Sequence, residues 1–253
     1  MKVKYYDLEN KNVFITGGGS GIGGSIVEHF CEQGSNVFFV DIDTEESNKL
    51  IKKISEKNYK NPNFTECDLL DIKKLTSTIE NIIKENGPVD ILINNAANDQ
   101  RHTTDDVDES YWDNRMAINL KHFFFTIKAV KNGMIKNKGG AIVNIGSVSW
   151  MLGEGDKVAY ETAKSAVVGL TRSFAKELGK YNIRSNSVVP GSIATERQIK
   201  HWLTPEYKQW ILDKQCLKRQ LMPDDVANLV LYLSSDISSG CTKQNFIVDA
   251  GIS

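Results

Sequence analysis

The sequence lacks the features that mark several large classes of protein. Its four cysteines and four histidines are scattered and form no C-x-x-C or H-E-x-x-H pattern, so neither a disulfide framework nor a metal site is predicted. No apolar stretch approaches the roughly 18 residues that a membrane span needs. Residues 1–7 contain no apolar core of a secretion signal. We therefore expect a cytoplasmic protein without a membrane partner.

The sequence also lacks an excess of charge of either sign. The chain has 31 basic and 32 acidic residues, a net charge of −1, and no basic stripe of the kind that binds phosphate backbones. Nucleic acid is therefore not an expected partner, and a small-molecule substrate is. Only five prolines occur, and those at Pro190 and Pro223 suit the boundaries of loops or helices. No repeat or linker divides the chain, and we expect one domain over residues 1–253.

Short apolar runs alternate with segments of helical length. The runs that we interpret as strands are residues 12–16, 36–40, 63–66, 90–93, 141–145, 185–189 and 245–248. Regular β-α alternation predicts an α/β fold with a doubly wound parallel sheet of about seven strands, flanked by helices. Ligands bind such sheets at the carboxyl ends of the strands. Residues 192–221 break the pattern, and we predict that they form a lid over the substrate.

The sequence Y-E-T-A-K places Tyr160 and Lys164 four residues apart, 13 residues after Ser147. On a helix this spacing puts both side chains on one face. An ammonium group beside a phenol stabilises the phenolate, which is then able to act as a general base. The same spacing also suits an amphipathic helix in which the tyrosine packs beneath a solvated lysine.

A glycine-rich turn follows the first predicted strand. Its sequence, G-G-G-S-G-I-G over residues 17–23, opens an apolar helix, and such turns let the backbone approach a pyrophosphate. The second predicted strand ends beside Asp41, whose carboxylate suits the hydroxyls of an adenosine ribose and repels a 2′-phosphate. These residues favour NAD over NADP as cofactor. A solvated carboxylate at a strand end is the alternative for Asp41.

With these residues assembled, the chain resembles the short-chain dehydrogenase/reductase family. The pattern T-G-x-x-x-G-x-G stands at Thr16, Gly17, Gly21 and Gly23, and N-N-A-A at residues 94–97 has Ala97 where the family usually has glycine. The resemblance implies a catalytic tetrad of Asn119, Ser147, Tyr160 and Lys164. In it, Lys164 lowers the pKa of Tyr160 and holds the nicotinamide ribose, Ser147 binds the reacting oxygen, and Asn119 holds a backbone carbonyl and a proton-relaying water. The cofactor residues that the resemblance implies, besides Tyr160 and Lys164, are Thr16, Gly17, Gly19, Ser20, Gly21, Ile22, Gly23, Asp41, Ile42, Asp68, Leu69, Asn95, Ala96, Ala97, Pro190, Gly191, Ile193 and Thr195.

Several loop segments show a narrower likeness, to bacterial NAD-dependent aldose 1-dehydrogenases and those acting on D-xylose in particular. These segments are residues 98–102, 149–153, 197–198, 202–206 and 215–218, while the acidic residues near 154–156 are shifted relative to those enzymes. The likeness implies oxidation of a sugar at C1 to a lactone. The substrate residues that it suggests are Asn98, Gln100, His102, Ser147, Trp150 and Gln198. His102, Arg101 and Trp150 also suit plain roles as solvated loop residues or lid packing.

Other substrates suit the same machinery, among them a 3-oxoacyl thioester or a polyol, and a non-catalytic NAD-binding regulator is a more remote alternative. Two long helices are predicted at residues 109–136 and 158–180. Their apolar stripes at residues 123–125 and 167–170 either form interfaces or lie inside the protomer. By resemblance we expect a homotetramer with dihedral symmetry.

Overall fold

The computed structural model describes residues 3–253 and contains a seven-stranded sheet in the order β3-β2-β1-β4-β5-β6-β7. Every neighbouring pair in it is parallel, which confirms the predicted doubly wound sheet. The strands are β1 (Asn12–Thr16), β2 (Asn36–Asp41), β3 (Asn63–Glu66), β4 (Ile91–Asn94), β5 (Gly140–Ile145), β6 (Ile183–Pro190) and β7 (Asn245–Val248).

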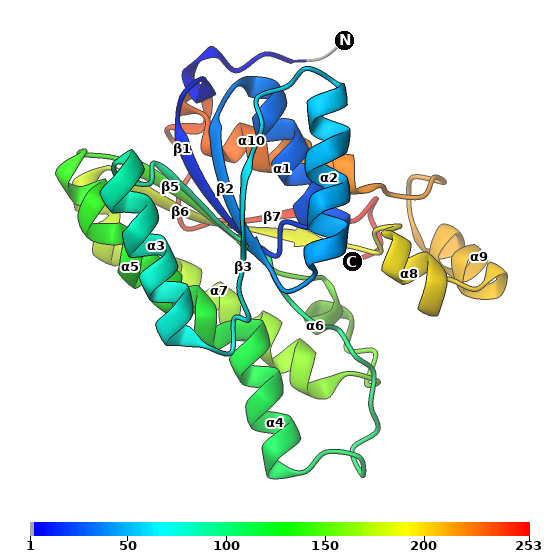
Figure 1. Ribbon diagram of the computed structural model, residues 1–253. Helices are drawn as coiled ribbons and strands as arrows, with labels where there is room; N and C mark the ends of the chain where they lie inside the picture. The colour runs from blue at the N-terminus through cyan, green and yellow to red at the C-terminus, as the bar shows by residue number, and fades with distance from the viewer. Residues whose placement is uncertain (1–2) are drawn as a thin grey trace.

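Helices cover both faces of the sheet (Figure 1). One face packs against α1 (Gly21–Gln33), α2 (Thr44–Glu56) and α10 (Pro223–Ser234), and the other against α3 (Ile72–Asn86), α5 (His122–Lys136) and α7 (Val158–Leu178). The remaining helices are α4 (Glu109–Met116), α6 (Ser149–Leu152), α8 (Glu196–His201) and α9 (Pro205–Lys214), with short turns η1 (Tyr6–Leu8), η3 (Gly179–Tyr181) and η4 (Asp236–Ser238). None of the helices within residues 3–253 has the length and apolar character to cross a membrane.

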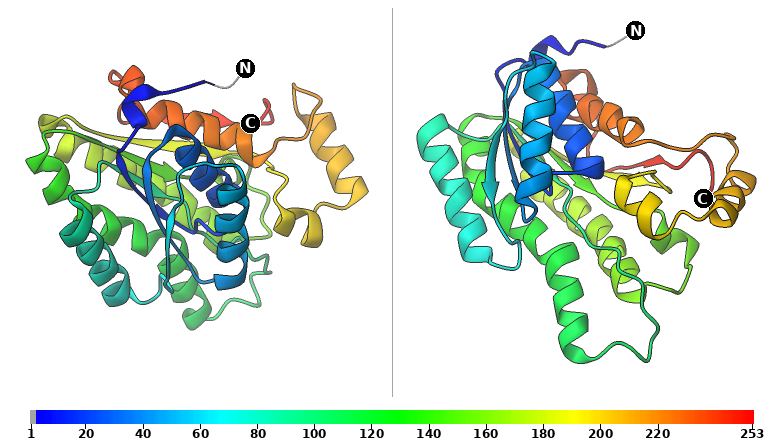
Figure 2. Two further views of the ribbon diagram at one scale, coloured as in Figure 1. Left: turned by 45° about the horizontal axis from the view of Figure 1, so that its top comes forward. Right: turned by 45° about the vertical axis from the view of Figure 1, so that its right-hand side comes forward.

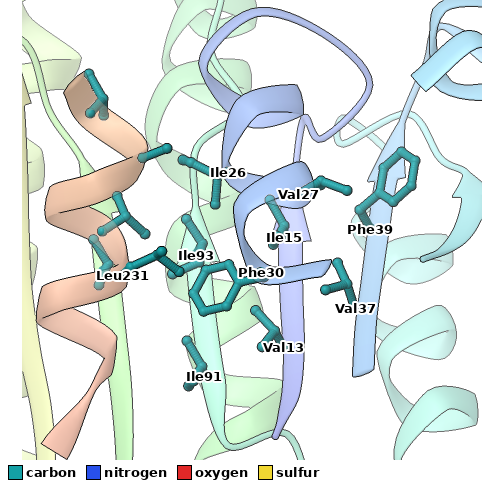
Figure 3. Close-up of a cluster of buried hydrophobic side chains, with 14 of the residues drawn as sticks. Val13, Ile15, Ile26, Val27, Phe30, Val37, Phe39, Ile91, Ile93 and Leu231 are labelled. Atoms are coloured by element: carbon teal, nitrogen blue, oxygen red, sulfur yellow. The ribbon is translucent and has the colours of Figure 1, made fainter. Parts of the chain in front are cut away.

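The apolar strands are buried because alternate residues face opposite helical layers. In β1, Val13 and Ile15 belong to the core beneath α1 and α10, whereas Phe14 belongs to the core beneath α3, α5 and α7. Figure 3 shows Phe30 of α1 packed between the sheet and Leu231 of α10. Each such fully buried side chain stabilises the fold by roughly 1.5–3 kcal/mol. This double-sided core fixes the strand ends on which the site is built.

The strand order reverses between β1 and β4. The chain runs outward through β2 and β3 on one side, and through β5, β6 and β7 on the other. Loops that follow β1 and β4 therefore diverge and leave a crevice at the carboxyl ends of the strands. Figure 2 shows α8 and α9 projecting from the sheet on the side where β6 ends.

The long helices and the predicted lid differ in part from expectation. The helix predicted at residues 109–136 is continuous but contains a π-helical turn, η2 (Ala117–Lys121), between α4 and α5. The predicted lid, residues 192–221, is less irregular than expected because it holds α8 and α9. Phe123 and Val167 of the two predicted apolar stripes are fully buried, which agrees with the alternative that the stripes lie inside the protomer, while Phe124 is 46% exposed.

Candidate active site

A cavity of about 710 Å³ opens at the crevice between the loops after β1 and β4. All of the predicted cofactor residues line it except Thr16 and Gly19, which lie just behind its wall. We call the part formed by residues 17–23, Asp41 and Asp68 the cofactor end. The part lined by Asp99, Arg101, Glu154, Lys157, Gln198 and Tyr207 is called the substrate end.

The glycine turn at the cofactor end leaves no room for side chains. Gly17 and Gly21 have positive φ angles of 65° and 55°, a conformation that side chains disfavour. A Cβ on Gly23 would lie 1.8 Å from the Gly17 carbonyl oxygen. Asn95, which follows β4, donates from Nδ2 to that same oxygen at 2.8 Å. The turn is thus fixed from two directions and exposes backbone at the start of α1.

Asp41 holds this turn while keeping part of its carboxylate open to the cavity. Its Oδ2 accepts a hydrogen bond from the Gly19 amide at 2.8 Å, and its Oδ1 accepts one from the Asp43 amide at 3.0 Å. Asp68 accepts a hydrogen bond from the Leu70 amide with Oδ1. The two carboxylates flank a turn in which Gly17, Gly21 and Gly23 carry no Cβ atom. This combination fits a dinucleotide, with the pyrophosphate at the turn and the adenosine ribose at Asp41.

Ser147, Tyr160 and Lys164 all line the cavity where its two ends meet. The Lys164 ammonium donates to the Ile145 carbonyl at 2.7 Å and lies 5.6 Å from the centre of the Tyr160 ring. Both side chains come from α7, and Ser147 follows β5 directly. The Ser147 hydroxyl lies 2.8 Å from that of Ser149. The predicted spacing therefore brings these three side chains together.

Burial dominates the protonation of this pair. It raises the pKa of Tyr160 above its ordinary value; the Asp99 charge adds to the rise and the Ser147 hydroxyl opposes it. Burial also lowers the pKa of Lys164 to about 7, an effect that Asp99 opposes. The protein alone thus favours the neutral form of Tyr160 and leaves Lys164 only about half charged near pH 7, less than the sequence led us to expect.

The fourth tetrad residue, Asn119, lies behind the cavity wall in the π-helical turn. Its Oδ1 accepts from the Asn98 amide at 2.8 Å, and its Nδ2 donates to the Asn98 carbonyl at 3.2 Å and to the Arg115 carbonyl at 2.9 Å. A π-turn widens a helix locally and turns side chains out of the regular pattern. Here it lets a fully buried amide hold the loop that follows β4.

Half of the predicted substrate residues line the cavity and half do not. Asn98, Ser147 and Gln198 line it, whereas Gln100, His102 and Trp150 lie outside its lining. The His102 ring joins two segments: Nδ1 lies 3.0 Å from the Thr103 carbonyl, and Nε2 accepts from the Ala159 amide at 3.3 Å. These contacts agree with the alternative that His102 is a loop residue rather than a substrate residue.

Arg101 and Lys157 at the substrate end were not assigned to the site from sequence. The Arg101 guanidinium lies 4.7 Å from the Trp202 ring centre and 5.4 Å from that of Tyr207, and its Nε lies 3.2 Å from Asp156 Oδ2. Arg101 thereby joins the loop after β4 to the lid. No local pattern signals this, because these residues meet only through the tertiary fold.

Lys157 neutralises the shifted acidic segment. Its ammonium donates to Glu154 and, at 2.8 Å, to Asp156, and only 9% of its side chain is exposed. Carboxylate oxygens of Glu154, Asp156 and Glu161 lie within 4.8 Å of one another. Lys157 supplies a positive charge to two of them, and Arg101 supplies a second one to Asp156.

Comparison with known proteins gives consistent results over nearly the whole chain. A family model described as enoyl-(acyl carrier protein) reductase matches residues 17–253. The D-xylose 1-dehydrogenase of Caulobacter vibrioides (strain NA1000 / CB15N) is 46% identical over 98% of this chain and 97% of its own. A Rhizobium meliloti (strain 1021) protein named "Probable galactose dehydrogenase GalD" is 41% identical over 98% of this chain and 97% of its own.

Among solved structures, a 7α-hydroxysteroid dehydrogenase complexed with NADH and 7-oxo glycochenodeoxycholic acid has a TM-score of 0.91 and 30% identity. The match covers 99% of this chain and 98% of that one.

Proposed function

The chain belongs to the short-chain dehydrogenase/reductase family, and from this premise we propose that it oxidises an aldose, D-xylose or a similar pentose, at C1 with NAD. The family uses NAD(P), and the chain acts as an oxidoreductase on CH–OH groups. One observation carries the proposal: Ser147, Tyr160 and Lys164 converge at the inner end of a dinucleotide cradle. The names of the two sugar dehydrogenases among the relatives support the choice of substrate.

The charges at the substrate end suit a neutral substrate. Arg101 and Lys157 are each paired with a carboxylate, as is Arg197, whereas Lys200 lines the cavity from an exposed position of α8. Glu154 and Asp99 supply hydrogen-bond acceptors, and Tyr207 supplies an aromatic face. A sugar needs both many acceptors and a face on which to stack.

In the proposed mechanism Tyr160 takes the proton of the C1 hydroxyl. When bound, NAD supplies the acceptor for the hydride that leaves C1. Ser147 donates a hydrogen bond to the reacting oxygen, and Lys164 lies beside Tyr160, where its charged form favours the phenolate. Asn119 holds the Asn98 backbone that forms the wall opposite. The product is a lactone, because C1 of a cyclic aldose already carries the ring oxygen.

We assign NAD rather than NADP to the cofactor end because of Asp41. Its carboxylate stands at the end of β2, fixed by two amides, where a 2′-phosphate would meet a negative charge. Replacement of Asp41 by Ser should therefore reduce the ratio of kcat/KM for NAD to that for NADP by about tenfold or more. An unchanged ratio would show that Asp41 does not set the preference for NAD.

We further propose a homotetramer in the cytoplasm, as the family resemblance implies. Phe124 of α5 and Trp112 of α4 are 46% and 37% exposed, and large exposed apolar side chains on neighbouring helices favour a contact with a second copy. Light scattering on the purified protein tests this, and a monomeric mass would exclude it.

The experiment that tests the function is a set of initial rates of NADH formation with D-xylose, L-arabinose, D-galactose, D-glucose and L-fucose, each repeated with NADP. We expect NAD-dependent turnover with one clear preference. Silence with every sugar together with tight NAD binding would instead favour a polyol or a 3-oxoacyl thioester on the same tetrad. The family model described as a reductase of acyl carrier protein substrates is the observation that keeps the thioester as second candidate.

A further inference from the structure

Asp99 is a carboxylate at the substrate end that the sequence pattern did not single out. It lines the cavity, and 27% of its side chain is exposed. Its Oδ2 accepts a hydrogen bond from Gln198 Nε2, and its Oδ1 lies 3.5 Å from Arg197 Nε. Both partners belong to α8. The carboxylate therefore stands between the loop after β4 and the lid, open toward the cavity.

The backbone that carries Asp99 is fixed by the tetrad. The amide and the carbonyl of the preceding residue, Asn98, both bond to the Asn119 side chain. Asn119 is fully buried in its π-helical turn. Two residues beyond Asp99, the Arg101 side chain pairs with Asp156 and stacks against the lid. The position of the Asp99 carboxylate is thus set from both sides, as a group that recognises a substrate must be.

The carboxylate keeps unused acceptor capacity. An ionised carboxylate has about four lone-pair sites. Gln198 occupies one of them, and the 3.5 Å separation from Arg197 is an ion pair rather than a close hydrogen bond. Asp99 lines the cavity, so a donor from a ligand bound there is able to reach the remaining sites.

Asp99 also lies within electrostatic reach of the reacting groups. Its charge raises the pKa of Tyr160 and that of Lys164, in each case second to burial. Tyr160, Lys164 and Asp99 line the same cavity, so one ligand bound there is able to meet all three.

We propose that Asp99 binds the substrate directly, accepting hydrogen bonds from hydroxyl groups next to the reacting carbon. This inference rests on the proposed function and deepens it, because it selects neutral polyhydroxylated substrates and opposes those with an anionic group at that place. Hydrogen bonds to a charged acceptor are the stronger class, whereas an anion would meet uncompensated repulsion.

The test pairs changes in the enzyme with changes in the sugar. Initial rates are measured for the wild type, Asp99→Asn and Asp99→Ala with the preferred aldose and its 2-deoxy and 3-deoxy analogues. We expect Asp99→Ala to lower kcat/KM for the full sugar by about 10- to 100-fold. The kcat/KM of the wild type should fall by a similar factor when one deoxy analogue replaces the full sugar. The kcat/KM of Asp99→Ala should fall by less than about threefold on the same replacement.

Two controls separate binding from other effects. Asp105→Asn removes the same charge from an exposed position of the same loop and should leave all rates within about twofold. Gln198→Ala removes one of the two contacts between Asp99 and α8 and leaves the Arg197 ion pair; because the carboxylate remains, its effect should be equal for full and deoxy sugars. The dissociation constant for NAD should stay unchanged in every variant.

The outcomes distinguish the inference from the function on which it rests. An active wild type in which Asp99→Ala and the deoxy sugars act additively would overturn the inference alone. A wild type that turns over no aldose would overturn the proposed function and the inference with it. Loss of the deoxy penalty in Asp99→Ala supports both.

Discussion

At the cofactor end, contacts run between neighbouring strands of the sheet, whereas at the substrate end they run between loops far apart in the chain. Asn95 at the end of β4 clamps the glycine turn that follows β1, and these two strands are paired. Asp99 and Gln198, by contrast, are 99 residues apart and meet only because α8, in the predicted lid, contacts the loop after β4. The first kind of contact is fixed by the sheet, and the second depends on how the loops pack.

This difference separates the parts of the site that hold the cofactor from those that select the substrate. Backbone amides, glycines without Cβ atoms and a strand-end carboxylate suffice to hold a dinucleotide, and they leave few ways to vary. The substrate end uses charged and aromatic side chains from two loops and the predicted lid, each of which can change without disturbing the sheet. Substitutions at the two ends should therefore separate effects on the cofactor from effects on the sugar.

The largest effect is expected where the two ends meet. Tyr160→Phe removes the proposed base and should lower kcat by about 1000-fold while leaving the dissociation constant for NAD within about twofold. Steady-state rates and NADH fluorescence titration measure the two quantities. Tyr6→Phe, at a tyrosine that is 79% exposed, is the matched control and should behave as wild type. Appreciable turnover by Tyr160→Phe would end the assignment of Tyr160 as base.

The next largest effect tests the cofactor end alone. Gly23→Ala places a methyl group 1.8 Å from the Gly17 carbonyl oxygen, so the turn must move, and we expect NAD affinity to fall by about 100-fold. Gly169→Ala is its control: this glycine lies in α7 with nothing within 4 Å of an added Cβ. That variant should keep its NAD affinity and gain about 0.5–1 kcal/mol in stability. Equal NAD affinity in both variants would show that the turn does not hold the cofactor.

The sequence predicted the places of the glycine turn, Asp41 and the Tyr160–Lys164 pair because each stands at a fixed point of a local element: Gly17 follows β1, Asp41 ends β2, and Tyr160 and Lys164 are one helical turn apart. Asn119 and Ser147 were implied by the family resemblance alone. Asp99 and Arg101 carry no such local signal, since their contacts come from α8, α9 and the segment before α7. No local pattern indicates that the His102 side chain contacts the start of α7, where its Nε2 accepts from the Ala159 amide. Helix-packing faces were also ambiguous, as the buried Phe123 shows.

A third prediction concerns His122, which contacts the backbone of Ala96 behind the cavity. His122 is fully buried, its Nε2 lies 3.1 Å from the Ala96 carbonyl, and burial together with the nearby Lys164 lowers its pKa to about 3. Unfolded, this histidine titrates near about 6.5, so between pH 6.5 and 3 the unfolded chain binds the extra proton. Its contribution to stability is therefore full above pH 6.5 and declines as pH falls, by about 1.4 kcal/mol for each pH unit.

Urea denaturation at pH 7 and pH 5 measures this decline. The wild type should lose about 2 kcal/mol more than His122→Gln, which keeps a donor for the Ala96 carbonyl but does not titrate. Because all other titrating groups are shared, they cancel in the difference between the two proteins. Parallel losses in both proteins would mean that His122 is protonated without penalty in the folded state.

The smallest effect tests whether the substrate end depends on loop packing rather than on charge. Arg101→Lys keeps the positive charge but loses the flat guanidinium that stacks near Trp202 and Tyr207, so we expect KM for the sugar to rise about tenfold. NAD affinity should not change, because the contact joins only the lid and the loop after β4. Arg172→Lys, at an exposed position of α7, is the control. If Arg101→Lys bound the sugar as the wild type does, charge alone would hold the lid and the comparison between the two ends would lose its physical basis.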